Sequence, residues 1–206
     1  DDVAVVHNGI IENFLELRNE LVAAGAVFSS ETDTEVVAHL VSAGLKAGKS
    51  PLEAVRDTLG RLQGAFALAI LFAGRKDLLA AARRGSPLAI GSGDGEMFIG
   101  SDAIALAPMT DRVTYLEDGD WAMVTDTGFT VYDAENHPVE REMRQSSATV
   151  TMVDRGNYRH FMAKEIHEQP EVVSHTLGRY IDMVGETIDL GAELAFDFKD
   201  LSRLTI

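Results

Sequence analysis

The hydrophobic periodicity of the sequence changes at Gly64, and this change constrains the fold more than any other feature. Before Gly64, apolar residues recur with the spacing of amphipathic helices that bury one face. After Gly64, short apolar runs alternate with turn residues, which indicates closely spaced antiparallel strands. The sequence therefore predicts an α+β fold in which a few helices are layered on antiparallel sheets.

Three helices are expected before Gly64. The first covers residues 12–24 and is stopped by a glycine. The second opens at Thr32–Glu35 and the third at Ser50–Glu53, and both openings match the capping box, in which a hydroxyl residue precedes Glu by three positions. The strands expected after Gly64 are residues 65–72, 78–82, 88–90, 97–99, 113–116, 121–124 and 129–132.

A further strand is expected at Val3–Val6, ended by Asn8-Gly9. All four of its residues are apolar, which favours burial on both faces and a central position in the sheet. A lone strand cannot satisfy its own backbone groups. Because Asp1-Asp2 leads directly into it without an initiating Met, we expect the native chain to begin further upstream.

The second half of the chain predicts a domain change. Residues 1–148 form the first expected domain, and residues 149–157 lack clear periodicity and are expected to be a linker. Residues 158–206 return to a helical pattern, interrupted at Pro170 and punctuated at Gly178, and are interpreted as the start of a second domain.

Composition excludes several classes of function. The net charge is −15, which disfavours nucleic acid and anionic membrane surfaces as partners. There is no cysteine, so the chain contains neither a disulfide nor a cysteine nucleophile. The longest apolar run, Ala65–Ala73, is too short for a membrane span, and no signal peptide is visible. A cytoplasmic location is the default expectation.

Asn8 and Gly9 are the first candidate site residues. Asn-Gly is a common hairpin-turn dipeptide, so a simple turn is one interpretation. The residues that follow predict a helix rather than a returning strand, which leaves a second interpretation open. A glycine at a strand end permits close approach of a substrate, and the Asn amide and Gly N–H are donors that could meet a developing oxyanion.

Asp33 is the second candidate. Acidic residues are common in the first turn of a helix because the helix dipole favours them there. The functional alternative is a carboxylate held at the helix start to pair with a substrate ammonium group.

Other motifs do not predict a site. Gly91–Gly95 leads into a strand rather than a helix, so a hairpin is favoured over a phosphate loop. Residues 31–35 lack the glycine and the later ligands of a calcium loop. His160 and His167 fit a solvated helix face better than a metal site. No metal and no cofactor are expected.

Several stretches carry a family resemblance when taken in order. Val5–Asn13, Glu31–Leu40, Ala82–Leu88 and Ile99–Asp102 resemble the glutaminase domain of class II glutamine amidotransferases. Tyr158–Pro170 resembles the segment that joins glutaminase to isomerase in the glutamine–fructose-6-phosphate aminotransferase family. The resemblance covers essentially the whole chain.

The resemblance implies an N-terminal-nucleophile hydrolase fold, a four-layer αββα sandwich whose N-terminal part is missing here, followed by the helical start of a sugar isomerase domain. In such enzymes an N-terminal Cys attacks the side-chain amide of glutamine, with its own α-amino group as the base. Ammonia then passes to fructose 6-phosphate and gives glucosamine 6-phosphate. By matching position, Asn8 and Gly9 would form the oxyanion hole. Gly9 and Asp33 would bind glutamine, and Asp33 would pair with the α-ammonium group of that substrate. A homodimer is implied for the full-length protein.

The departures from the family are large. The N-terminal Cys, the upstream Arg-Trp loop and most of the isomerase domain are absent, so we expect this chain alone to be inactive. One alternative is another class II amidotransferase, such as the one acting on phosphoribosyl pyrophosphate, although Tyr158–Pro170 argues against it. The other is a non-catalytic domain that has lost its nucleophile. Residues upstream of Asp1 would discriminate between an enzyme and such a domain.

Overall fold

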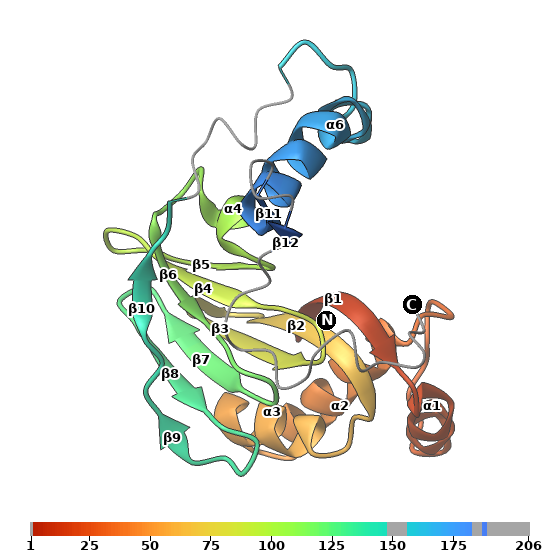
Figure 1. Ribbon diagram of the computed structural model, residues 1–206. Coiled ribbons are helices and arrows are strands. Elements are labelled where there is room, and N and C mark those ends of the chain that lie inside the picture. Colours follow the sequence, from red (N-terminus) through yellow and green to blue (C-terminus); the bar gives the residue numbers. More distant parts are fainter. Residues whose placement is uncertain (1, 148–155, 183–186, 189–206) are drawn as a thin grey trace, which may run out of the picture. The chain divides into compact units, whose positions relative to one another are not determined.

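The computed structural model describes residues 2–147, 156–182 and 187–188. The chain divides into two compact units, residues 1–153 and residues 154–206. The first unit contains two antiparallel sheets and the helices that cover them (Figure 1).

The larger sheet has six strands in the order β1-β2-β3-β7-β8-β9. The smaller sheet has four strands in the order β10-β6-β4-β5. All neighbouring strands in both sheets are antiparallel. Their bounds are β1 Val3–Ile11, β2 Gly64–Phe72, β3 Arg75–Arg84, β4 Ala89–Ser92, β5 Met97–Gly100, β6 Arg112–Tyr115, β7 Trp121–Thr125, β8 Phe129–Tyr132, β9 Pro138–Val139 and β10 Met143–Gln145.

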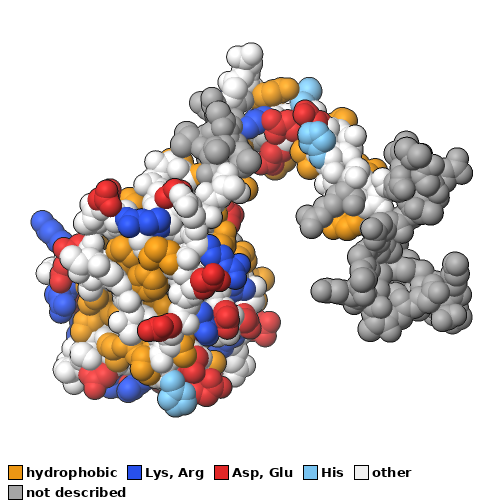
Figure 2. Space-filling view, turned by 60° about the vertical axis from the view of Figure 1, so that its left-hand side comes forward, with side chains coloured by type: hydrophobic (Ala, Val, Ile, Leu, Met, Phe, Trp, Pro, Cys, Tyr) orange, Lys and Arg blue, Asp and Glu red, His pale blue; other side chains and the backbone are white. Residues whose placement is uncertain are grey.

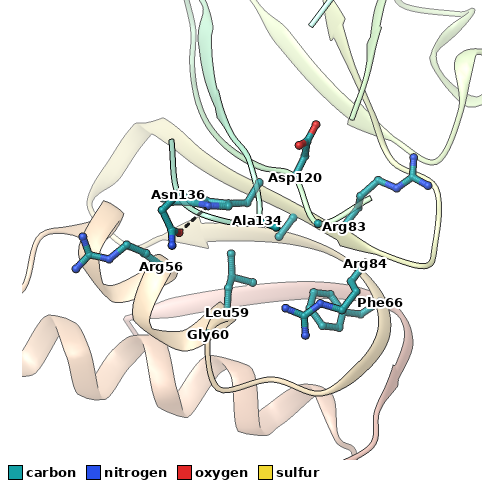
Figure 3. A pocket seen from close by; sticks show the side chains of 12 residues that line it. Arg56, Leu59, Gly60, Phe66, Arg83, Arg84, Asp120, Ala134 and Asn136 are labelled. Atoms are coloured by element: carbon teal, nitrogen blue, oxygen red, sulfur yellow. Dashed lines mark hydrogen bonds between the residues drawn. The ribbon is translucent and has the colours of Figure 1, made fainter. Parts of the chain in front are cut away.

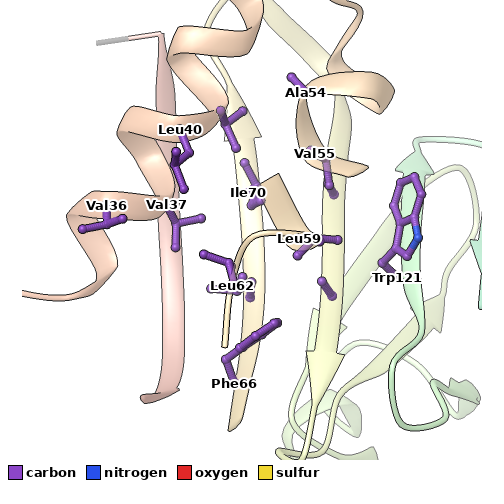
Figure 4. Packing of buried hydrophobic residues seen from close by; sticks show 14 of the residues in the cluster. Val36, Val37, Leu40, Ala54, Val55, Leu59, Leu62, Phe66, Ile70 and Trp121 are labelled. Carbon is purple, nitrogen blue, oxygen red and sulfur yellow. The ribbon is translucent and has the colours of Figure 1, made fainter. Parts of the chain in front are cut away.

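Helices cover one face of the larger sheet. The chain passes from β1 into α1 (Phe14–Ala23), α2 (Thr34–Lys46) and α3 (Pro51–Leu59) before it returns as β2. In Figure 4 the apolar side chains of α2 and α3 point toward β2 and the neighbouring strands. The fully buried residues of this layer include Val37, Val55, Phe66 and Ile70.

Alternation along the strands separates this helix-facing core from a second core between the sheets. In β2, Phe66 and Leu68 belong to the helix-facing core, whereas Ala67 belongs to the core between the sheets. In β4, Ile90 also faces the larger sheet, and Ala89 packs on the opposite side against the short helix α4 (Ala103–Leu106). The described layers therefore run helices, sheet, sheet and α4.

The structure confirms the expected strands after Gly64, their antiparallel pairing and the three helices before it. It adds β9, β10 and α4, which are too short to give a periodic signal.

The expectation of a central, short first strand is wrong. Strand β1 runs through Asn8-Gly9 to Ile11 and pairs only with β2, so within the described ranges it is an edge strand. Only one of its faces is covered: Val6 and Ile10 are each 65% exposed, whereas Ile11 is fully buried. An apolar run alone did not distinguish a doubly buried strand from an edge strand.

The expected capping box at the start of α2 is also wrong. Asp33 is the N-cap residue but makes no capping hydrogen bond, and Glu35 binds the preceding loop instead. The same pattern at Ser50–Glu53 is confirmed, with the Ser50 hydroxyl accepting from the Glu53 N–H and the Glu53 carboxylate accepting from the Ser50 N–H.

The second unit contains α6 (Phe161–Tyr180) and a small two-stranded sheet of β11 (Ile181–Asp182) and β12 (Thr187–Ile188). The expected interruptions at Pro170 and Gly178 are wrong, because α6 continues through both. Proline removes one backbone donor but keeps a helical φ, so the flanking turns can stay helical. No helix in the described ranges is long and apolar enough to cross a bilayer.

A buried ion pair fastens the segment after β9 to the larger sheet. Asp120, which is 2% exposed, accepts two hydrogen bonds from the Arg141 guanidinium, at 2.8 and 3.0 Å. It also accepts the N–H of Glu117 at 2.7 Å. The hydrogen bonds that Arg141 donates to Asp120 are the main reason that the pKa of Arg141 is raised.

Replacing Arg141 should therefore destabilise the fold. Arg141→Ala leaves the Asp120 carboxylate buried without its cation, and we expect a loss of about 2–4 kcal/mol in the free energy of unfolding. The matched control is Arg144→Ala, because Arg144 pairs with Glu142 and both side chains are exposed. That control should change stability by less than about 0.5 kcal/mol. Urea unfolding measures both, and equal losses would contradict this account of the pair.

Candidate functional site

The last part of β1 carries two of the predicted site residues, Asn8 and Gly9. At the two ends of β1, the Ala73 N–H donates to the Asp2 carbonyl and the Glu12 N–H donates to the Gln63 carbonyl. In an antiparallel pair the hydrogen-bonded residues alternate, so the even-numbered residues of β1 direct their backbone groups toward β2. The register stays one-to-one through Gly9 and Phe66. The N–H of Gly9 therefore faces the open edge of the sheet, as does that of Ile11.

The side chains of β1 point alternately to the two faces of the sheet. Asn8 is exposed and lines a hollow of about 520 Å³ between the two sheets. The other walls of this hollow come from β2, from the approach to β4 and from the end of β5. It brings together Asn8, Pro87-Leu88 and Ile99–Ser101, which belong to three of the stretches that carry the family resemblance.

Gly9 is required by the close approach of β1 and β2. Its φ is +128°, a conformation that L residues with side chains rarely adopt. A Cβ at Gly9 would lie 2.2 Å from the carbonyl oxygen of Ala65. Gly64 and Gly85 also have positive φ, and they lie against Ile10 of β1 and Ala65 of β2, next to the same contact. The backbone beside Asn8 is thus exposed to a ligand from one side and tightly packed on the other.

Asp33 is held against the end of β1. One carboxylate oxygen, Oδ2, accepts the Ile11 N–H at 2.8 Å, and the other, Oδ1, lies 3.7 Å from His7 Nδ1. The side chain remains 22% exposed. The structure therefore places Asn8, Gly9 and Asp33 at the same end of one strand, although Asp33 does not line the hollow beside Asn8.

The loop before Asp33 is fixed by Glu35. The Glu35 carboxylate accepts the backbone N–H groups of Ser29 and Ser30, each at 2.7 Å, and both serine hydroxyls. These hydrogen bonds, led by the one from the Ser29 N–H, lower the pKa of Glu35 to about 2. The stabilisation is present above pH 4.5 and is lost as the pH falls toward 2.

Sequence reasoning missed His7 and Glu35 as parts of this site. The Glu35 carboxylate also lies 3.5 Å from His39 Nε2, and the His39 ring packs on Phe28. Alternation in β1 could have indicated His7, since a polar residue adjacent to Asn8 must face the helices. Nothing in the local pattern could have indicated Glu35, because the same spacing also predicts a capping box.

A second hollow, of about 400 Å³, lies between α3 and the ends of β3 and β7, and none of the predicted site residues line it. Figure 3 shows the guanidinium groups of Arg56, Arg83 and Arg84 pointing in different directions. Arg84 also lies over the Phe66 ring and donates to the Leu62 carbonyl. These cations are therefore engaged separately and do not converge on one anion.

The surface charge gives no simpler candidate. Figure 2 shows acidic and basic side chains interspersed around an apolar area on one face of the first unit. Among the residues with described positions, no three His, Asp or Glu side chains lie together as metal ligands would.

Substituting Gly9 should cost much more than substituting a glycine in open space. In Gly9→Ala the new methyl group meets the Ala65 carbonyl, and we expect a loss of about 3 kcal/mol or more, or a failure to fold. Gly48→Ala is the matched control, since Gly48 also has a positive φ but no atom within 4 Å of its Cβ position. It should lose about 1–2 kcal/mol. Thermal unfolding compares the two, and similar losses would show that the close approach is unimportant.

Known proteins resemble this chain in sequence and in fold. Residues 1–108, just over half of the chain, match the family model described as glutamine amidotransferase domain. Two solved structures share the fold. The glutamine phosphoribosylpyrophosphate amidotransferase from B. subtilis, complexed with ADP and GMP, has a TM-score of 0.54 and 27% identity, covering 64% of this chain and 29% of its own. The allosteric regulatory enzyme of purine biosynthesis has a TM-score of 0.53 and 26% identity, covering 64% and 28%.

Curated relatives are more similar in sequence. The glutamine–fructose-6-phosphate aminotransferase (isomerizing) of Bradyrhizobium diazoefficiens is 59% identical over 204 residues, which is 99% of this chain and 34% of that protein. The protein of the same name from Mesorhizobium japonicum is 60% identical over all 206 residues and 34% of its own length. The chain thus spans about a third of the length of these relatives, and they confirm the resemblance found in the sequence. Because the family model matches more than half of its residues, the chain belongs to the glutamine amidotransferase domain family.

Proposed function

We propose that the first unit is the glutaminase part of an isomerising glutamine–fructose-6-phosphate aminotransferase. The observation that carries this proposal is the arrangement of Asn8, Gly9 and Asp33 at one end of β1, next to a hollow between the sheets. The full-length enzyme would hydrolyse glutamine and transfer ammonia to fructose 6-phosphate, giving glucosamine 6-phosphate. The high identity with relatives of that name supports this choice.

Asn8 and Gly9 would stabilise the charge that develops on the amide oxygen of glutamine. The Asn8 side chain is exposed beside the hollow, and the Gly9 N–H faces the open edge of β1. A side-chain donor and a backbone donor on adjacent residues could both meet the tetrahedral oxyanion as it forms. The nucleophile would be an N-terminal Cys, which this chain does not contain.

Asp33 would hold the α-ammonium group of glutamine. Its carboxylate is fixed by the Ile11 N–H while part of it remains exposed. An anion at this position attracts the ammonium equally in the ground state and in the transition state. It would therefore select and orient the substrate rather than accelerate the chemical step.

The finer architecture belongs to the same proposal. The layers of the first unit correspond to the four-layer sandwich of N-terminal-nucleophile hydrolases, with residues 1–148 as a partial glutaminase domain. Residues 149–157 would be the linker, and residues 158–206 the start of the sugar isomerase domain. The full-length protein would act in the cytoplasm as a homodimer.

The competing function is that of another class II amidotransferase, such as the phosphoribosylpyrophosphate amidotransferase whose solved structure is similar to this chain. The identity of the two solved structures is 26–27% over 64% of the chain, whereas the aminotransferases are 59–60% identical over 99–100% of it. The aminotransferase alignments therefore include the stretch Tyr158–Pro170, which the sequence predicts to be the joint to an isomerase.

The two site residues should fail differently in a full-length protein that carries the nucleophile. Asn8→Ala removes a donor to charge that exists only in the transition state, so kcat should fall by about 10²–10³ with little change in KM. Asp33→Asn removes uniform binding, so it should mainly raise the KM for glutamine. Steady-state glutamate release measures both.

Exposed residues of the same types serve as controls. Asn19→Ala on α1 and Asp94→Asn on a surface turn should leave both kinetic constants within about twofold of the parent. Unchanged kcat in Asn8→Ala would remove the oxyanion role, and unchanged KM in Asp33→Asn would remove the ammonium role. In the alternative turn and helix-start interpretations, both variants lose only stability.

The 206-residue chain alone should release no glutamate from glutamine above background, because it contains no cysteine. Circular dichroism and cooperative unfolding would first establish that the tested chain is folded. A full-length protein that carries the N-terminal Cys provides the positive control. Glutamate release by the 206-residue chain itself would overturn the assignment of a Cys nucleophile.

A further inference from the structure

His7 lies on β1 between the two proposed functional groups, Asn8 and the Asp33 carboxylate, but faces the opposite side of the strand from Asn8. Its side chain is 3% exposed, compared with 22% for the side chain of Asp33. A buried imidazole needs a reason to lie on the side of β1 that is otherwise apolar, with Val3, Val5 and Ile11. The proposed reaction uses Asn8, Gly9 and Asp33 and leaves His7 without a role.

The described polar contacts of the His7 ring are all made by Nδ1, toward the start of α2. His7 Nδ1 is 3.0 Å from the Thr34 hydroxyl and 3.7 Å from Asp33 Oδ1. Within the described residues, the other ring nitrogen, Nε2, is buried without a hydrogen-bond partner. Of the two neutral tautomers, the one with hydrogen on Nδ1 leaves no buried N–H donor unpaired, and it presents a positive N–H edge to Thr34 and Asp33.

Asp33 is consequently held from two sides. The Ile11 N–H fixes Oδ2, and the His7 ring lies beside Oδ1 and anchors the adjacent residue Thr34. The backbone of Asp33 and Thr34 also starts α2, so a shift of this junction would move the carboxylate relative to β1. A carboxylate that must meet an ammonium group at hydrogen-bond distance depends on such supporting contacts.

We propose that His7 is a positioning residue that sets the Asp33 carboxylate for recognition of the substrate's α-ammonium group. The inference rests on the proposed function and extends it to a residue that touches no substrate. His7 would thereby contribute to selectivity for an α-amino acid amide over an otherwise identical amide that lacks the α-amino group. It would leave the chemistry at the side-chain amide, on the other face of β1, unchanged.

The test compares two compounds in a full-length protein that carries the nucleophile. L-Glutamine reports on ammonium recognition through its KM, and 4-carbamoylbutanoate, which is glutamine without the α-amino group, reports on the rest of the site through its inhibition constant. His7→Phe keeps the ring volume and removes both nitrogens. It should raise the KM for glutamine about tenfold, because loss of the hydrogen bond to Thr34 would let the Asp33 carboxylate move from its position. The kcat and the inhibition constant should change by less than about twofold.

Two more variants separate positioning from packing. His7→Asn places an amide nitrogen near the position of Nδ1 and should restore most of the lost affinity. Thr34→Val keeps the shape of Thr34 but removes the hydroxyl that holds the ring. It should raise the KM for glutamine in the same direction as His7→Phe, and it decides the question if His7→Phe does not fold.

The outcomes distinguish this inference from the proposed function. Asp33→Asn must weaken glutamine and not 4-carbamoylbutanoate; if it weakens neither selectively, the proposed role of Asp33 fails and this inference fails with it. If Asp33→Asn is selective but His7→Phe and Thr34→Val only lower the melting temperature, or weaken both compounds equally, His7 is purely structural. Absence of rescue by His7→Asn would likewise count against positioning through Nδ1.

Discussion

The close pairing of β1 with β2 is the contact on which the rest of the site depends. The two strands stay in unbroken register for nine residue pairs, from Val3–Phe72 to Ile11–Gly64. At Gly9 they are so close that only a hydrogen atom fits against the Ala65 carbonyl. This approach fixes the direction of the two residues that precede Gly9. It turns Asn8 toward the space between the sheets and His7 toward the helices.

Energetically, the site is built from polar contacts at the border of a large apolar core. Val36 and Val37, at the start of α2, are completely buried and hold that helix against the sheet. The hydrogen bonds of Asp33 and Glu35 then fix the loop and the first turn of that helix. Burial thus decides where α2 lies, and the polar contacts decide where its first carboxylate points.

Much of this could be predicted from the sequence, because periodicity reports which face of an element is buried. The strands after Gly64 and the helix cap at Ser50 followed directly from such patterns. The edge position of β1 did not, since pairing partners are set by residues distant in sequence. Glu35 and Glu53 make the same point, because both follow a hydroxyl residue by three positions. Only Glu53 completes a capping box, whereas Glu35 accepts the N–H groups of Ser29 and Ser30 in the preceding loop.

The edge position of β1 also determines which of its amide hydrogens are protected from solvent exchange. Backbone groups of the even-numbered residues point to β2, whereas those of Val3, Val5 and His7 point to the open edge, where no described strand accepts them. Ile11 belongs to the second set but donates to Asp33. A single strand therefore contains slow and fast amides in alternation, and Ile11 is slowed by a side chain instead of a neighbouring strand. Its exchange rate would report on the carboxylate of Asp33 without any substrate present.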